Sequence, residues 1–189
     1  MNNNFLNNFY GTLFTPEKTF EEIKQTKPMV TAIIIVILIS VLKVFLYSEP
    51  MTSANSFLYG SNLVFASFSG IVSWLFFAGF FELIAKIFNR GSRYKTLLVL
   101  SAFAMLPWIF LGPVEIYKMI DTSGAAGGMF LGLLVFIWVI SLQIYAILKT
   151  YELNIGKTVL FILIPFLGWL VFLNLIINFF NTIAHLFQR

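Results

Sequence analysis

Five long apolar stretches determine what this chain of 189 residues can fold into. A helix that crosses the hydrocarbon core of a bilayer needs about 20 mostly apolar residues. Stretches of this kind lie at Met29–Tyr47, Asn62–Phe88, Thr96–Val114, Gly127–Leu148 and Thr158–Phe180. The sequence therefore predicts an all-α, polytopic integral membrane protein with five transmembrane helices. Because Pro107, Gly112 and Pro113 interrupt the third stretch, we expect it to end early or to bend near Pro107.

The composition indicates that lipid forms part of the solvent. Apolar residues make up 59% of the chain and charged residues 11%, which is too little polar surface for a water-soluble globule of this size. We expect a cytoplasmic amphipathic N-terminal segment at residues 1–28 and a membrane domain at residues 29–189. The net charge of +4 comes from basic residues beside apolar segments. Anionic lipid headgroups are closer to them than nucleic acid, so the bilayer is the expected partner.

The basic residues also predict the orientation. Nine of the 12 Lys and Arg residues fall on one side of the five crossings. These nine are Lys18, Lys24, Lys27, Lys86, Arg90, Arg93, Lys95, Lys149 and Lys157. Only Lys43, Lys118 and Arg189 are assigned to the other side. The positive-inside rule then gives a cytoplasmic N-terminus and an external C-terminus, which agrees with an odd number of crossings.

Two short helices are expected before the first span. The first carries an apolar stripe at helical spacing, formed by Phe5, Leu6, Phe9, Tyr10 and Leu13. Its polar face holds asparagines without Lys or Arg, so it either lies on the membrane surface or packs against the protein's own helices.

The second short helix is expected to follow Thr15, a suitable N-cap, with Pro16 in its first turn. Phe20 and Ile23 point the same way, and Pro28 ends the helix and leads the chain into the bilayer.

The segment from Leu13 to Lys24 (LFTPEKTFEEIK) resembles the opening of bacterial members of the Yip1 family, with Pro16, Phe20 and Ile23 at the matching positions. The sequence GSRYK at residues 91–95, followed by AFAMLP at residues 102–107, resembles the third helix of that family. Ile137-Trp138 with Lys157-Thr158 resembles its last hairpin, so the similarity spans nearly the whole chain.

This resemblance implies an all-α membrane domain with a cytosolic N-terminus, in the bacterial cytoplasmic membrane. Eukaryotic members are associated with small Rab-type GTPases through a longer N-terminal region. Because only about two dozen residues precede the first span here, that function is not carried over.

The sequence offers little catalytic chemistry. It has no cysteine and a single histidine, so we expect no catalytic set, no metal site and no cofactor. Gly156-Lys157-Thr158 matches the end of a P-loop, but Tyr151 stands where the first glycine is required, so we expect no nucleotide.

Glu82 is one candidate for an intramembrane polar site, because it lies about 9 Å inside the cytoplasmic end of the second span. One interpretation pairs Glu82 with Lys86 at the favourable i, i+4 spacing. The other makes Glu82 a titratable or cation-binding carboxylate that faces a water-filled groove.

A polar stripe on the last span is the second candidate, formed by Asn174, Asn178, Asn181 and His185. It serves either for hydrogen bonds between helices or as the wall of a polar pathway, joined by Gln143 and by serines of the second span. Ser69 and Ser73 also suit close helix packing.

Together these observations favour a non-enzymatic membrane protein that organises the membrane or holds partner proteins. The alternative is a small transporter, channel or lipid-handling protein that uses Glu82 and the asparagine stripe. A homo-dimer is compatible with the small-residue faces, as is a monomer.

Overall fold

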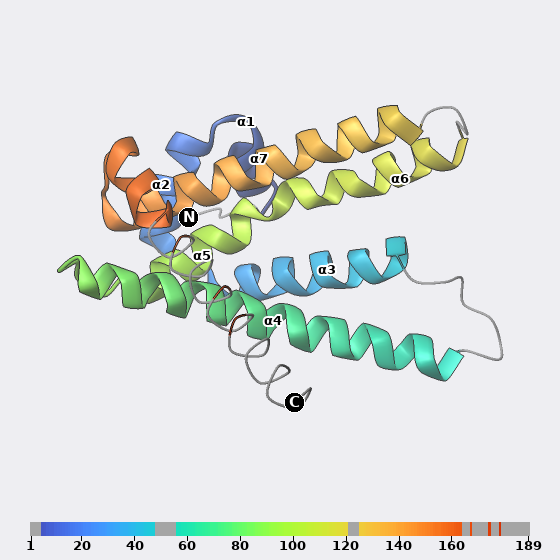
Figure 1. Cartoon of the computed structure of the whole chain (residues 1–189), viewed down its shortest axis with the longest axis horizontal. Helices are drawn as coiled ribbons and strands as arrows, with labels where there is room; N and C mark the ends of the chain where they lie inside the picture. Colours follow the sequence, from blue (N-terminus) through green and yellow to red (C-terminus); the bar gives the residue numbers. More distant parts are fainter. Residues whose placement is uncertain are drawn as a thin grey trace, which may run out of the picture. The chain divides into compact units, whose positions relative to one another are not determined.

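The computed structural model describes residues 5–47, 56–120 and 125–163, together with residues 167, 174 and 178. Within these residues every regular element is a helix. The chain divides into two compact units, Met1–Glu152 and Leu153–Arg189, and helices α1 to α7 belong to the first (Figure 1).

Two short helices precede the first span, where the sequence predicts them: α1 covers Phe5–Phe14 and α2 covers Pro16–Thr26. Thr15 separates them because its backbone (φ −137°) leaves the helical region, although its side chain makes no capping hydrogen bond. α2 ends because Lys27 adopts a left-handed conformation (φ 45°) and donates its N–H to the carbonyl of Ile23.

Four segments of the described chain are helical, long and apolar enough to cross a membrane, which makes this a polytopic membrane protein. The helices that form them are α3 (Met29–Tyr47), α4 (Ser56–Ile87), α5 (Tyr94–Ala104) with the 3-10 helix η1 (Leu106–Phe110) and α6 (Leu111–Ile120), and α7 (Ala125–Tyr151). The first span has the predicted bounds. The second begins before Asn62 and the third continues past Val114, so both are longer than the sequence predicts.

The predicted fifth span, Thr158–Phe180, lies mostly outside the described residues. Residues 155–163 are helical, as are the isolated positions 167, 174 and 178. Five crossings and the sidedness of the termini therefore stay predictions from the sequence.

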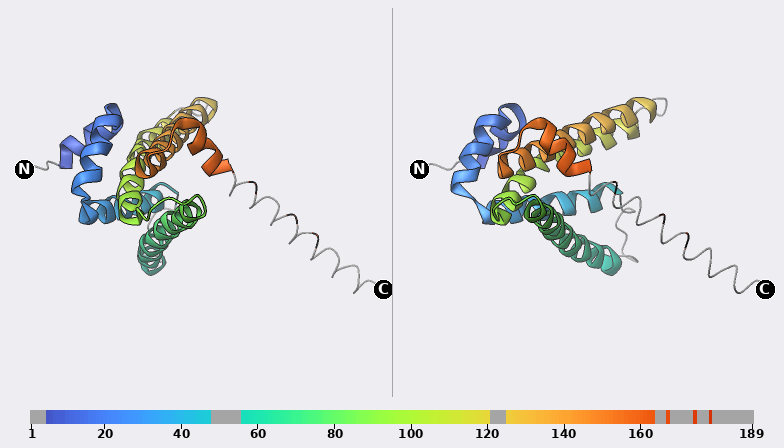
Figure 2. Two further views of the ribbon diagram at one scale, coloured as in Figure 1. Left: turned by 90° about the vertical axis from the view of Figure 1, so that its left-hand side faces the viewer. Right: turned by 60° about the vertical axis from the view of Figure 1, so that its left-hand side comes forward.

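The third span is the centre of the first unit. In its most apolar stretch 67% of the residues are buried, against 11–28% in the other three spans. α3 packs beside α4 and α6 packs beside α7, while α5 contacts α3, α4 and α7 (Figures 1 and 2). Most of the apolar surface of α4 and α7 consequently faces outward, as expected for helices in contact with lipid.

Pro107 breaks the third span where the sequence predicts an interruption. A proline has no backbone N–H to donate to the carbonyl four residues earlier, so an α-helix cannot continue through it unchanged. The chain instead forms η1, in which Trp108 donates its N–H to the carbonyl of Met105 (3.0 Å), and it changes direction between α5 and α6 (Figure 1). The expected bend is present, and the helix does not end there.

Candidate functional site

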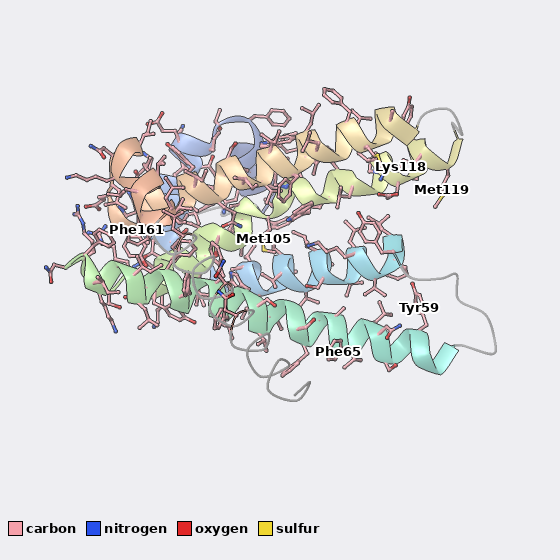
Figure 3. The ribbon with its side chains drawn as sticks, viewed as in Figure 1. Tyr59, Phe65, Met105, Lys118, Met119 and Phe161 are labelled. Atoms are coloured by element: carbon pink, nitrogen blue, oxygen red, sulfur yellow. The ribbon has the colours of Figure 1, made fainter. Side chains whose placement is uncertain are left out.

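A groove of about 620 Å³ lies between α3, α4 and the centre of the first unit. Its polar lining residues come from four helical segments and are Ser40, Lys43, Ser69, Ser73, Ser101 and Gln143. Met105, which also lines it, lies at the junction of α5 and η1 (Figure 3). Three of the residues that the sequence assigns to a polar wall, Gln143, Ser69 and Ser73, therefore share one groove.

The close approach of α3 to α4 forms one side of this groove. A Cβ atom added to Gly70 would collide with the hydroxyl of Ser40 and would lie 3.0 Å from its Cβ atom. Glycine at position 70 is therefore what lets the two helices come together there. This agrees with the packing role that the sequence suggests for the small residues of the second span.

Among the described residues that line the groove, Lys43 is the one cation, and the sequence did not single it out as a site residue. Its ammonium lies 4.7 Å from the centre of the Trp108 ring, which gives it a cation–π contact. No ion pair within the described part of the chain joins it to a carboxylate, and Glu115 on α6 pairs instead with Lys118 (2.7 Å). The sequence could have indicated Lys43, because this charged residue lies inside the apolar run Met29–Tyr47 and not beyond its end.

Gln143 and Trp74 connect the groove to the most buried helix. Gln143 donates its Nε2–H to the carbonyl of Ser101 (2.9 Å), and Trp74 donates its Nε1–H to the Ser101 hydroxyl (3.0 Å). The Oε1 atom of Gln143 is buried and has no hydrogen-bond partner among the described residues. The amide is thus held in place by α5 and retains a vacant acceptor.

Glu82 lies outside this groove. Its side chain is only 6% exposed, and its Oε2 atom accepts hydrogen bonds from the Tyr151 hydroxyl (2.9 Å) and from the backbone N–H of Arg93 (3.2 Å). Arg93 immediately precedes α5, so the carboxylate accepts a hydrogen bond from one of the N–H groups left unpaired at the start of that helix and interacts favourably with the helix dipole. Lys86 is exposed, and no ion pair to Glu82 is present in the described residues. Neither interpretation of Glu82 from the sequence included these partners.

An ion network ties α2 to the end of α7. Glu152 accepts from Lys24 (2.8 Å) and from Arg93 (2.6 Å), and Glu21 accepts from Lys149 (3.0 Å). The hydrogen bond from Arg93, followed by that from Lys24, lowers the pKa of Glu152 from 4.5 to about 2, so this carboxylate stays ionised at neutral pH. The network brings together three segments that the charge pattern places on the cytoplasmic side.

The segment that leads into the first span is anchored by its apolar residues. Pro16 occupies the first turn of α2, and Phe20 and Ile23 are both completely buried. The Phe20 ring lies 5.7 Å from that of Tyr145 on α7. α2 is therefore fixed to the membrane domain by packing as well as by charge.

The asparagine stripe of the last predicted span is described at two positions. Asn178 donates its Nδ2–H to the Oδ1 atom of Asn174 (2.6 Å), as the spacing of four residues on a helix allows. Asn181 and His185 lie outside the described residues.

Comparison with known proteins identifies the family of this chain. Searches of the curated proteins and of the solved structures return no match. The family model of the Yip1 domain matches residues 10–177, which include α2, the groove and the ion network. That match covers most of the chain, and the chain belongs to the Yip1 family.

Proposed function

We propose that this Yip1-family protein is a non-enzymatic organiser of the membrane, most simply the bacterial cytoplasmic membrane, and that α1 is the element that acts. The observation that carries the proposal is the outward-facing apolar surface of α1. Phe5, Leu6, Tyr10 and Phe14 are 42–68% exposed, whereas Thr12 and Leu13 are buried. Moving side chains of this kind out of water is favourable, by about 1.5–3 kcal/mol for each that becomes fully buried.

The attachment of α1 supports a fixed position near the membrane surface. A Cβ atom at Gly11 would collide with the hydroxyl of Thr19, so α1 and α2 touch at a point where only glycine fits. α2 in turn is held by Phe20, Ile23 and the ion network. A helix attached in this way enters the headgroup region at a set depth and pushes lipids apart in one leaflet.

α1 carries no Lys or Arg, so attraction to anionic lipid contributes little to its position. Its membrane contact is expected to be insensitive to salt and to depend on apolar area. A partner protein with a complementary apolar groove is the other occupant that this surface suits.

A single label decides where the surface of α1 lies. The chain has no cysteine, so Leu6→Cys gives one site for an environment-sensitive fluorophore, and Lys18→Cys on exposed α2 surface gives a matched control. In phosphatidylcholine vesicles we expect a blue-shifted emission at position 6, quenched by spin-labelled lipid, and water-like emission at position 18.

The organising activity is measured on the vesicles themselves. We expect the wild-type chain to change vesicle diameter in electron micrographs, and the double variant Leu6→Asn, Phe14→Asn to lose this effect while inserting normally. Water-like emission at position 6, or unchanged remodelling by the double variant, would rule out the proposal and leave a partner protein as the occupant.

A further inference from the structure

The positive charge of Lys43 lies inside a membrane span without a counter-ion from the described part of the chain. Lys43 precedes the last residue of α3, Tyr47, by four positions, which places it about 6 Å from the helix end. A charge at such depth is costly unless it is paired or hydrated. The cation–π contact with Trp108 offsets part of this cost and holds the ammonium at the groove.

The remainder of the groove suits hydrocarbon together with a few polar atoms. Its apolar lining includes Trp74, Phe77, Ile39 and Met105, while Ser40 and Tyr47 lie on α3 together with Lys43. Its volume of about 620 Å³ is within the range of small-ligand sites, roughly 300–1,000 Å³. Such a lining fits an amphiphile better than it fits an ion alone.

The route to the groove is through the membrane. All the described lining residues belong to membrane spans, and Ser73, on the α4 side, is exposed. A ligand therefore arrives from the bilayer or along α3 from the Tyr47 end. The ligand that is abundant there and carries a negative group is an anionic phospholipid.

The geometry points to a binding site for an anionic phospholipid, with its phosphate at the Lys43 ammonium and the Ser73 hydroxyl, and an acyl chain along Trp74 and Phe77. This site is formed by α3, α4, α5 and α7, so it is independent of the role proposed for α1.

Native mass spectrometry of the full chain in detergent tests the site. Dioleoyl phosphatidylglycerol and dioleoyl phosphatidylcholine, titrated separately, are expected to give one saturable site that prefers phosphatidylglycerol. Lys43→Gln should weaken phosphatidylglycerol binding about fivefold, which corresponds to the roughly 1 kcal/mol that one basic residue contributes. Lys43→Arg should retain the preference, and soluble glycerol 3-phosphate should not compete.

Two further variants keep the test decisive. Lys86→Gln removes one exposed charge from the other end of α4 and should leave the preference unchanged. Ser73→Phe fills the groove without altering the charge and should reduce the binding of both lipids. This variant serves as the test if Lys43→Gln fails to fold. Unaltered phosphatidylglycerol binding in both Lys43→Gln and Ser73→Phe, or an equal loss in Lys86→Gln, would overturn the proposal.

Discussion

Glu82 shows how one buried carboxylate joins three segments of this protein. It belongs to α4, and it accepts one hydrogen bond from the Tyr151 hydroxyl at the end of α7 and another from the Arg93 backbone N–H just before α5. Each of these hydrogen bonds is stronger for an ionised acceptor than for a neutral one. Glu82 is therefore a positioning residue for the start of the most buried helix.

Replacing Glu82 tests this role. Glu82→Gln should lower the free energy of unfolding by about 1.5–3 kcal/mol, because the charged acceptor is lost, and Tyr151→Phe by about 1 kcal/mol. Lys86→Gln should change it by less than about 0.5 kcal/mol. Unfolding of the purified protein in mixed micelles, followed by circular dichroism, measures the free energy of unfolding of all three variants. An equal loss in Lys86→Gln would indicate instead that Glu82 pairs with Lys86, as their spacing suggests.

The partners of single polar residues were largely beyond prediction from the sequence. The spacing of Glu82 and Lys86 indicates a local pair, yet the observed partners of Glu82 are 11 and 69 residues away along the chain. Such pairings follow from how helices pack, which no local pattern encodes. The burial of Phe20 and Ile23 could be anticipated, because helical spacing alone places them on one face.

At the scale of helices, packing in lipid depends on how closely backbones approach, because lipid tails are as apolar as the side chains they replace. α3 and α4 achieve this at Gly70 and Ser40. The positions of the four described spans were predictable from the thickness of a bilayer, although the second and third are longer than predicted. For the contact between α3 and α4, the sequence predicted only that small residues would permit close packing, not which residues would meet. The bend at Pro107 was predictable because a missing N–H is a property of the residue itself.

The contact between α3 and α4 gives a second prediction. Gly70→Ala should destabilise the protein by about 1–3 kcal/mol, since the new methyl group displaces Ser40 and separates the helices. Ser40→Gly in the same chain should recover most of that loss, as expected for residues in direct contact.

Gly132→Ala on α7 is the matched control for Gly70→Ala, because a Cβ atom at position 132 meets no atom within 4 Å. It should leave the free energy of unfolding unchanged or raise it slightly. A loss at position 70 no larger than at position 132 would show that the close approach contributes nothing.

For the whole molecule, the ion network and the charge pattern agree on one end of the first unit. Lys24, Arg93 and Lys149 come from three separate connections, and all three meet carboxylates there. A bundle whose spans alternate in direction brings these connections to one surface, as the positive-inside rule requires for the cytoplasmic side.

Labelling of intact cells tests the orientation. Because the chain has no cysteine, Ser92→Cys and Ser123→Cys each create a unique target for a membrane-impermeant maleimide. Position 123 should react from outside and position 92 only after the membrane is permeabilised. The reverse pattern would invert the predicted topology.

The bonds between α2 and the end of α7 also affect the order in which the protein matures. Lys24 and Glu152 are 128 residues apart, as are Glu21 and Lys149. At roughly 5–20 residues per second, a ribosome needs about 6–26 s to make the chain between them. The ion pairs that join α2 to the end of α7 can form only after α7 has been made, so newly made chains present Glu21 and Lys24 without these partners while the preceding spans are inserted.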